Sequence, residues 1–131
     1  MKRTALLHAE LSEVIARLGH GDLIVIGDAG LPMPDGPRRI DLALTRNIPR
    51  FHEALSTILS EMHVERAVIA NELAIHNPEV HADLVRQLGT TPISTMSHEN
   101  FKAQTRVARA IVRTGEFSPF ANVILRAGVV F

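Results

Sequence analysis

The chain has 131 residues, 14 basic and 14 acidic side chains, and an isoelectric point near 7.1. This length suits one domain with a single core, and the balanced charge excludes a strong overall attraction to nucleic acid or anionic membranes. The absence of cysteine excludes a disulfide framework and thiolate metal sites, and is typical of a reducing compartment.

The first half of the chain alternates between helical and extended patterns. Charges interrupt the N-terminal apolar residues too early for a signal peptide, and no apolar run is long enough to span a membrane. We therefore expect a cytoplasmic protein. Apolar spacing predicts a helix over residues 8–19 and another over 49–62, with Pro49 in its first turn. Short aliphatic runs predict strands over 22–28 and 39–44.

The second half continues the alternation. Residues 77–89 give the clearest helix signal, with an asparagine cap, a proline in the first turn and a terminal glycine. The other predicted elements are strand 65–71, strand 91–97, a short helix 98–105 capped by Ser97, and strands 108–115 and 121–131. This order predicts an α/β fold: a single layered domain, residues 1–131, with a central, mainly buried sheet flanked by helices.

The stretch from Gly27 to Leu44 is an unusual connection between two strands, because it contains three glycines, three prolines and, at the end of the first strand, Asp28. Proline fixes backbone angles, so we expect a stiff loop that holds Asp28 at the carboxyl end of its strand. Ligands of open α/β sheets bind beyond such strand ends. The alternative is an aspartate that only hydrogen-bonds its own turn.

Histidine and aspartate supply two further candidates. His20 lies between two glycines, and an imidazole suits proton transfer near neutral pH. An ordinary surface histidine is the alternative. For Asp41 we favour a structural role, either half-exposed on its strand or paired with Arg38 or Arg39.

His98 and Lys102 are four residues apart, so on a helix they share one face and could hold a hydroxylated or anionic ligand. An exposed amphipathic turn, with Phe101 as its contact to the core, is the alternative. Residues 114–122 form a polar loop between two apolar strands, with Asn122 at a strand entrance.

Several common motifs are missing. His76 and His81 lack a helical metal-ligand spacing, and we find no phosphate-binding loop, dinucleotide motif or nucleophile elbow. The basic residues between Lys102 and Arg113 lack the interleaved aromatic residues of a nucleic-acid surface. We therefore expect no metal, no cofactor and no nucleic-acid partner.

Hydrophobic residues make up 46% of the chain and the mean hydropathy is +0.11. In a domain this small, so much apolar material favours burial between subunits. The composition therefore predicts a homo-oligomer.

Three segments together resemble the D-ribose pyranases, a family of small bacterial sugar mutarotases. They are "RLGHGD", "DAGLPMPDGPRRIDLAL" and "HENFKAQT…ARAIVRTGEFSPFANVILRAGVVF". The likeness covers nearly the whole chain. The L-fucose mutarotases, which share the fold, match these motifs less well.

The resemblance implies a reaction and a set of residues. The family interconverts the pyranose and furanose forms of D-ribose without a metal or cofactor. Its catalytic histidine corresponds to His20. Its sugar-binding positions correspond to Asp28, His98, Phe120, Ala121 and Asn122, with Lys102 beside the sugar. The resemblance also implies a ring of eight or ten copies, with sites near the subunit boundaries.

One position departs from the family pattern. The family carries a tyrosine whose hydroxyl touches the sugar, where this chain has Phe120. Two other functions therefore stay open: a sugar-binding module without catalysis, and a mutarotase for another sugar such as L-fucose.

Overall fold

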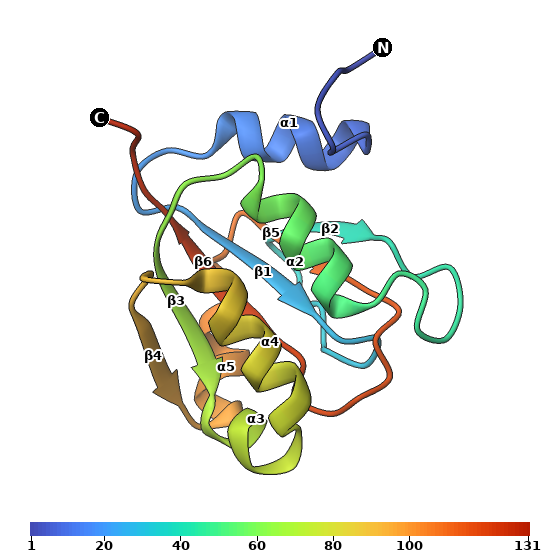
Figure 1. Ribbon diagram of the computed structural model, residues 1–131, viewed down its shortest axis with the longest axis vertical. Helices are drawn as coiled ribbons and strands as arrows, with labels where there is room; N and C mark the ends of the chain where they lie inside the picture. Colours follow the sequence, from blue (N-terminus) through green and yellow to red (C-terminus); the bar gives the residue numbers. More distant parts are fainter.

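The computed structural model describes all residues from 1 to 131, and it contains one six-stranded mixed sheet (Figure 1). Across the sheet the strand order is β2-β5-β1-β6-β3-β4. The strands are β1 (Leu23–Gly27), β2 (Arg38–Asp41), β3 (Val64–Ala70), β4 (Ile93–Met96), β5 (Ala110–Arg113) and β6 (Val123–Ala127). The predicted α/β architecture with a central, flanked sheet is confirmed.

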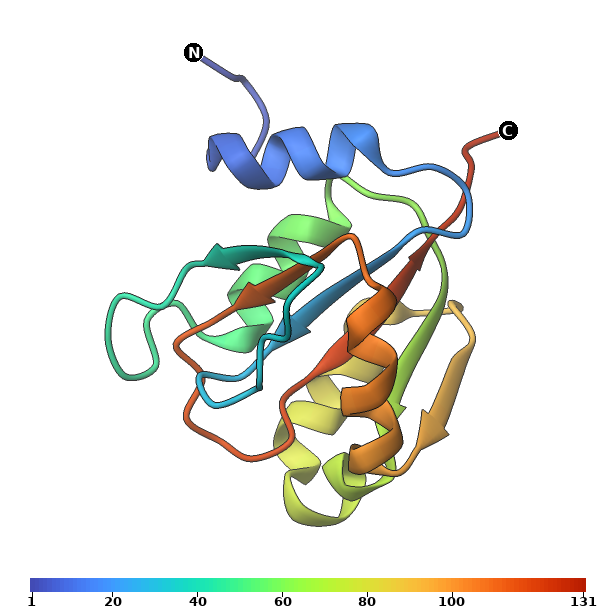
Figure 2. The same cartoon turned by 180° about the vertical axis from the view of Figure 1, so that it is seen from behind.

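Helices cover both faces of this sheet. They are α1 (Ala9–Arg17), α2 (Phe51–Leu59), α3 (Asn71–His76), α4 (Pro78–Leu88) and α5 (His98–Gln104), followed by the short 3₁₀ helix η1 (Thr105–Val107). Helices α2 and α4 lie over one face (Figure 1), and α5 lies over the other (Figure 2). None of the helices has the length and apolar character needed to cross a bilayer.

The direction of the strands determines which side chains meet. Every strand except β6 runs the same way, and β6 is antiparallel to both of its neighbours, β1 and β3. The carboxyl ends of β1, β3, β4 and β5 therefore lie beside the amino end of β6. We call this end of the sheet, which carries Asp28, His98 and Asn122, the Asp28 end. The opposite end, which carries His20, Glu65 and Arg126, is the His20 end.

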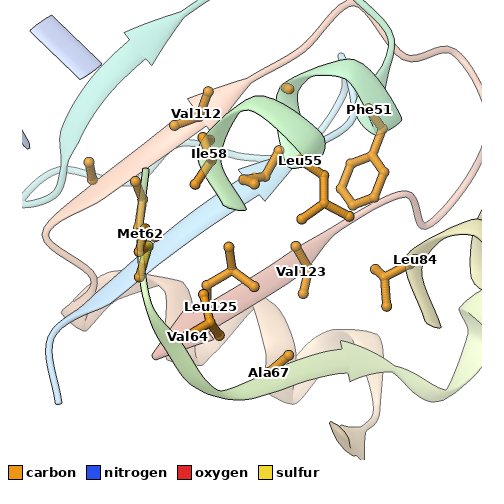
Figure 3. Packing of buried hydrophobic residues seen from close by; sticks show 14 of the residues in the cluster. Phe51, Leu55, Ile58, Met62, Val64, Ala67, Leu84, Val112, Val123 and Leu125 are labelled. Carbon is orange, nitrogen blue, oxygen red and sulfur yellow. The ribbon is translucent and has the colours of Figure 1, made fainter. Parts of the chain in front are cut away.

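The main core lies between the sheet and helices α1, α2 and α4. Apolar residues recur along α2 at helical spacing, and Phe51, Leu55 and Ile58 are fully buried against the sheet (Figure 3). A smaller cluster of six buried residues fills the other face, where Phe101 of α5 is fully buried. The predicted core contact of Phe101 is confirmed.

The structure corrects three local predictions. Pro49 precedes α2 instead of forming its first turn: it follows a cis peptide bond, and Arg50 is the cap. The strand predicted over 65–71 ends at Ala70, where α3, which we did not predict, begins. Asn77 does stand at the start of α4, but its side chain donates to Ser118 Oγ and the carbonyl of Pro119 instead of capping the helix.

Candidate functional site

The Asp28 end is organised around two residues, Asp28 and Asn122, that form two hydrogen bonds with each other. The backbone N–H of Asp28 donates to Asn122 Oδ1 at 2.8 Å, and Asn122 Nδ2 donates to Asp28 Oδ2 at 3.0 Å. The other carboxylate oxygen of Asp28 accepts the N–H of Gly30 at 2.9 Å. Asp28 therefore closes its own turn, as the alternative interpretation expected, and it also joins β1 to β6.

This pairing requires glycine at position 27. A Cβ atom on Gly27 would lie 2.5 Å from a methyl carbon of Leu31 and 3.0 Å from Asn122 Oδ1. The proline-containing loop turns back at this point and buries Leu31. The close approach of loop and strand thus fixes where the carboxylate of Asp28 points.

Burial changes the acidity of Asp28. Partial burial raises the pKa of this carboxyl group above its ordinary value, and hydrogen bonds from Gly30 and Asn122, with the nearby His98, oppose the rise. A carboxylate held half-buried at a strand end, with its orientation fixed, is suited to accept hydrogen bonds from a hydroxylated ligand.

Three aromatic rings, those of Phe120, His98 and His76, pack against one another. The ring of Phe120 packs edge-on against His98, with centroids 5.0 Å apart, and lies 5.5 Å from the ring of His76. Phe120 has a positive φ of 58°, unusual for a bulky residue and a mark of local strain. Glu72 accepts the backbone N–H of His98 at 3.0 Å. The Nδ1 atom of His98 is buried and has no hydrogen-bond partner.

A buried carboxylate fixes the loop that carries Phe120. Both oxygens of Glu116 face Arg50, at 3.1 and 3.3 Å, and they also accept the N–H of Phe51 and the hydroxyl of Ser118. Burial alone would raise the pKa of Glu116, but these donors outweigh it and lower the pKa from 4.5 to about 2. The loop is therefore anchored by a permanent negative charge.

A pocket opens between these two loops. Its volume is about 390 Å³, enough for a small molecule, and its lining includes Asp28, Gly30, Glu116 and Ser118. His98, Phe120 and Asn122 do not line this pocket, and both Asn122 and Ala121 are fully buried. Ala121 packs in the main core.

Two further residues singled out in the sequence, Lys102 and Asp41, form ion pairs. Lys102 shares the exposed face of α5 with His98 and forms an ion pair with Glu99 at 2.7 Å. Asp41 has a structural role, as predicted, but its partner is Arg113 at 2.7 Å and not Arg38 or Arg39. Nowhere does the chain bring three His, Asp or Glu side chains into a group suited to a metal ion.

His20 is not part of this group. It lies at the His20 end, where its Nε2 is 2.8 Å from Glu65 Oε2, and its side chain is 58% exposed. The five residues of β1 separate it from Asp28, a length of about 16 Å at 3.3 Å per residue. One copy of the chain brings together Asp28, His98 and Asn122, but it does not bring His20 to them.

Sequence reasoning missed three acidic residues: Glu65, Glu72 and Glu116. Glu72 follows β3 at the same sheet edge as Asp28, so the strand-end argument applied to Asp28 could have identified it. Nothing in the sequence indicates the partners of Glu65 and Glu116, which lie 45 and 66 residues away.

Comparison with known proteins gives consistent matches along the whole chain. The model of the RbsD / FucU transport protein family matches residues 1–130. A D-ribose pyranase of Variovorax paradoxus is 59% identical, with all of both chains covered. The structure of Bacillus subtilis RbsD complexed with D-ribose has a TM-score of 0.97 and 44% identity, again with all of both chains covered. A fucose mutarotase of Streptococcus pneumoniae in complex with L-fucose is more distant, with a TM-score of 0.87 and 27% identity over the full length of both chains.

Proposed function

The chain belongs to the RbsD/FucU family, and on this basis we propose that it acts as a D-ribose pyranase, an isomerase that interconverts the pyranose and furanose forms of D-ribose. One observation carries the proposal: identity of 59% to a D-ribose pyranase over the full length of both chains. The ribose-bound relative, at 44% identity, supports ribose over L-fucose, since the fucose-bound relative is only 27% identical.

The chemistry requires two rounds of proton transfer. A base removes the proton of the anomeric hydroxyl and an acid protonates the ring oxygen as its bond to C1 breaks, which gives the open-chain aldehyde. The 4-hydroxyl then attacks C1, loses its proton to a base, and the aldehyde oxygen gains one, which closes the furanose ring. No net proton or electron is exchanged, so positioned acid and base groups suffice.

The Asp28 end supplies the binding groups in this proposal. The carboxylate of Asp28 accepts hydrogen bonds from sugar hydroxyls, and the imidazole of His98 provides a second polar contact. The aromatic ring of Phe120 packs on the apolar face of the sugar, and Asn122 holds the carboxylate in place. The backbone of Ala121 and the ammonium group of Lys102 border the same space.

His20 is the proton-transfer group in this proposal, and it reaches the sugar from a neighbouring copy. Its separation from Asp28 within one chain supports a site shared between copies. Both ends of the sheet also expose apolar side chains that a neighbour could cover. They are Leu44, Ile48 and Phe117 near the Asp28 end, and Val130 and Phe131 near the His20 end.

Assembly and location follow from this proposal. A closed ring repeats one contact between the two ends of adjacent copies, and we predict eight or ten copies in the cytoplasm, with no nucleic-acid or membrane partner. Analytical ultracentrifugation of the purified protein measures the copy number. A stable monomer with full activity would contradict the shared site.

Saturation-transfer NMR tests the activity directly. Irradiating the C1 proton of a ribopyranose should reduce the furanose signal more strongly when the protein is present, because the two forms then exchange faster. The same experiment with L-fucose shows whether the enzyme prefers ribose. If ribose binds but its exchange is not accelerated, the chain is a sugar-binding module and the proposed function is wrong.

A further inference from the structure

The His20 end contains an irregularity in the sheet that affects one side chain. Along the β3–β6 pair, Val64 lies opposite Ala127 and Arg66 lies opposite Arg126. Two residues of β3 therefore span one step of β6, and Glu65 is the extra residue of a β-bulge. Bulges of this kind change the direction of a side chain and are frequent beside active sites.

The bulge directs the Glu65 carboxylate at His20. Glu65 Oε2 lies 2.8 Å from His20 Nε2, and Glu65 Oε1 accepts a hydrogen bond from Arg126 Nε at 2.7 Å. Each oxygen thus has its own partner. Since Arg126 holds one oxygen, the carboxylate is oriented before the imidazole meets it.

This contact determines which nitrogen of His20 carries its proton. The hydrogen bond from His20, with a smaller effect of Arg126, lowers the pKa of Glu65, so the carboxylate is ionised at neutral pH. An ionised carboxylate only accepts hydrogen bonds, so Nε2 of His20 must donate. In the neutral imidazole the free lone pair is then on Nδ1, the nitrogen that faces away from Glu65.

We infer that Glu65 is a positioning residue for the reaction: it holds His20 in the tautomer with a basic Nδ1 and stabilises the imidazolium formed when Nδ1 takes a proton from the sugar. This inference rests on the proposed function. Arg126 supports the arrangement by fixing the carboxylate of Glu65.

Gly128 packs closely against Glu65 and His63. A Cβ atom on Gly128 would lie 3.0 Å from Glu65 Cβ and 2.7 Å from His63 Cδ2. The other ionisable groups at this corner are His63 itself and the ion pair between Asp22 and Arg109, at 2.9 Å. Asp22 is committed to Arg109 and to the N–H of Gly19, so Glu65 is the carboxylate that contacts the imidazole.

The test compares the Glu65→Gln and Glu65→Ala variants with the wild type, after ultracentrifugation has shown that all three proteins have the same oligomeric state. Removal of the carboxylate should reduce kcat between about ten- and a hundredfold, less than the ~10²–10⁴-fold contributed by a proton-transfer group itself. KM for ribose should change less than twofold.

The pH dependence gives a second readout. In Glu65→Gln the acid limb of the kcat–pH profile should move to lower pH, because the imidazolium loses its counter-charge. Glu13→Gln, which removes another exposed carboxylate paired with arginine, is the matched control and should leave kcat, KM and the pH profile unchanged.

Nitrogen NMR of His20 provides a readout that does not depend on turnover. Wild-type protein should show the Nε2–H tautomer, and Glu65→Ala should show a mixture. An unchanged kcat and pH profile in both Glu65 variants, or a mixed tautomer in the wild type, would overturn the role of Glu65 while leaving the proposed function intact. A wild-type protein that does not accelerate ribose exchange would instead overturn the proposed function, and this inference with it.

Discussion

The two ends of the sheet are built in opposite ways. At the Asp28 end, Asn122 and Glu116 are almost fully buried, and each makes several hydrogen bonds to neighbouring loops. At the His20 end, His20 is 58% exposed, and Glu65 and Arg126 are 32% and 50% exposed. The first end is rigid before a ligand arrives, whereas the second presents a short ion-paired chain to solvent.

This difference separates binding from proton transfer. A site whose carboxylates are already held by hydrogen bonds loses little conformational freedom when a sugar binds, which favours affinity. An exposed imidazole next to one carboxylate can gain and lose protons with little change in its surroundings, which suits acid–base work. Substitutions at the His20 end should therefore change kcat, and substitutions at the Asp28 end should change KM or stability.

The largest effect is expected from His20→Ala. Loss of the proton-transfer group should reduce kcat by about 10²–10⁴-fold, while the dissociation constant for ribose, measured by calorimetry, stays within about twofold of the wild type. His52→Ala removes another exposed histidine and should leave kcat unchanged. A His20→Ala protein with full activity would remove the distinction between the two ends.

Glu116 gives a prediction about stability and pH. Its folded-state pKa of about 2 lies below the ordinary 4.5, so its stabilising effect is complete above pH 4.5 and is lost as the pH falls toward 2. The effect is at most about 3 kcal/mol, because each unit by which the pKa is lowered corresponds to about 1.36 kcal/mol and Arg50 is partly exposed.

Denaturant unfolding at constant protein concentration measures this contribution. Glu116→Gln should lower the free energy of unfolding at pH 7 and should lose less stability than the wild type between pH 4.5 and 2. Glu99→Gln, at an 81% exposed position, should stay within about 0.5 kcal/mol of the wild type. Equal acid sensitivity of Glu116→Gln and the wild type would contradict this account.

Asn122→Ala tests the paired side chains of the Asp28 end. It removes the acceptor of the Asp28 N–H and the donor to its carboxylate, which costs about 1–3 kcal/mol when such groups are left buried. We expect KM for ribose to rise about tenfold and kcat to fall much less. Asn100→Ala, at an exposed position, is the control. A fall in kcat alone would show that Asn122 acts on the chemistry and not on binding.

Phe120→Tyr should have the smallest effect. The added hydroxyl restores the hydrogen bond that the resemblance attributes to the family's tyrosine, worth about 0.5–1.5 kcal/mol, so KM should fall between about two- and tenfold with kcat unchanged. An unchanged KM would show that this loop does not bring a hydroxyl to the sugar.

Much of the fold could be predicted from sequence, because the signals are local. Alternation of apolar residues, the terminal glycine at position 89 and the cap at Ser97 each act within a few residues, and the structure contains the helices and strands that they predict. The predicted start of α2 was wrong, because a proline is equally compatible with the first turn of a helix and with the position before the cap, where Pro49 lies. Helix α3 was missed because its six residues directly follow a strand.

The candidate site was only partly predictable. Asp28 and Asn122 could be proposed from their places at strand ends, but their mutual hydrogen bonds span 94 residues and depend on the position of β6 in the sheet. The partners of Glu65 could not be predicted either, since a one-residue bulge in β3 decides where its side chain points.

The place of β6 also has a consequence for how the protein is made. Strand β6 lies in the middle of the sheet, between β1 and β3, so the growing polypeptide has two unpaired strand edges until residues 123–127 are synthesised. Unpaired strand edges of this kind can form hydrogen bonds with the strands of other chains. A product truncated before Val123 would keep both edges exposed, and we expect it to aggregate.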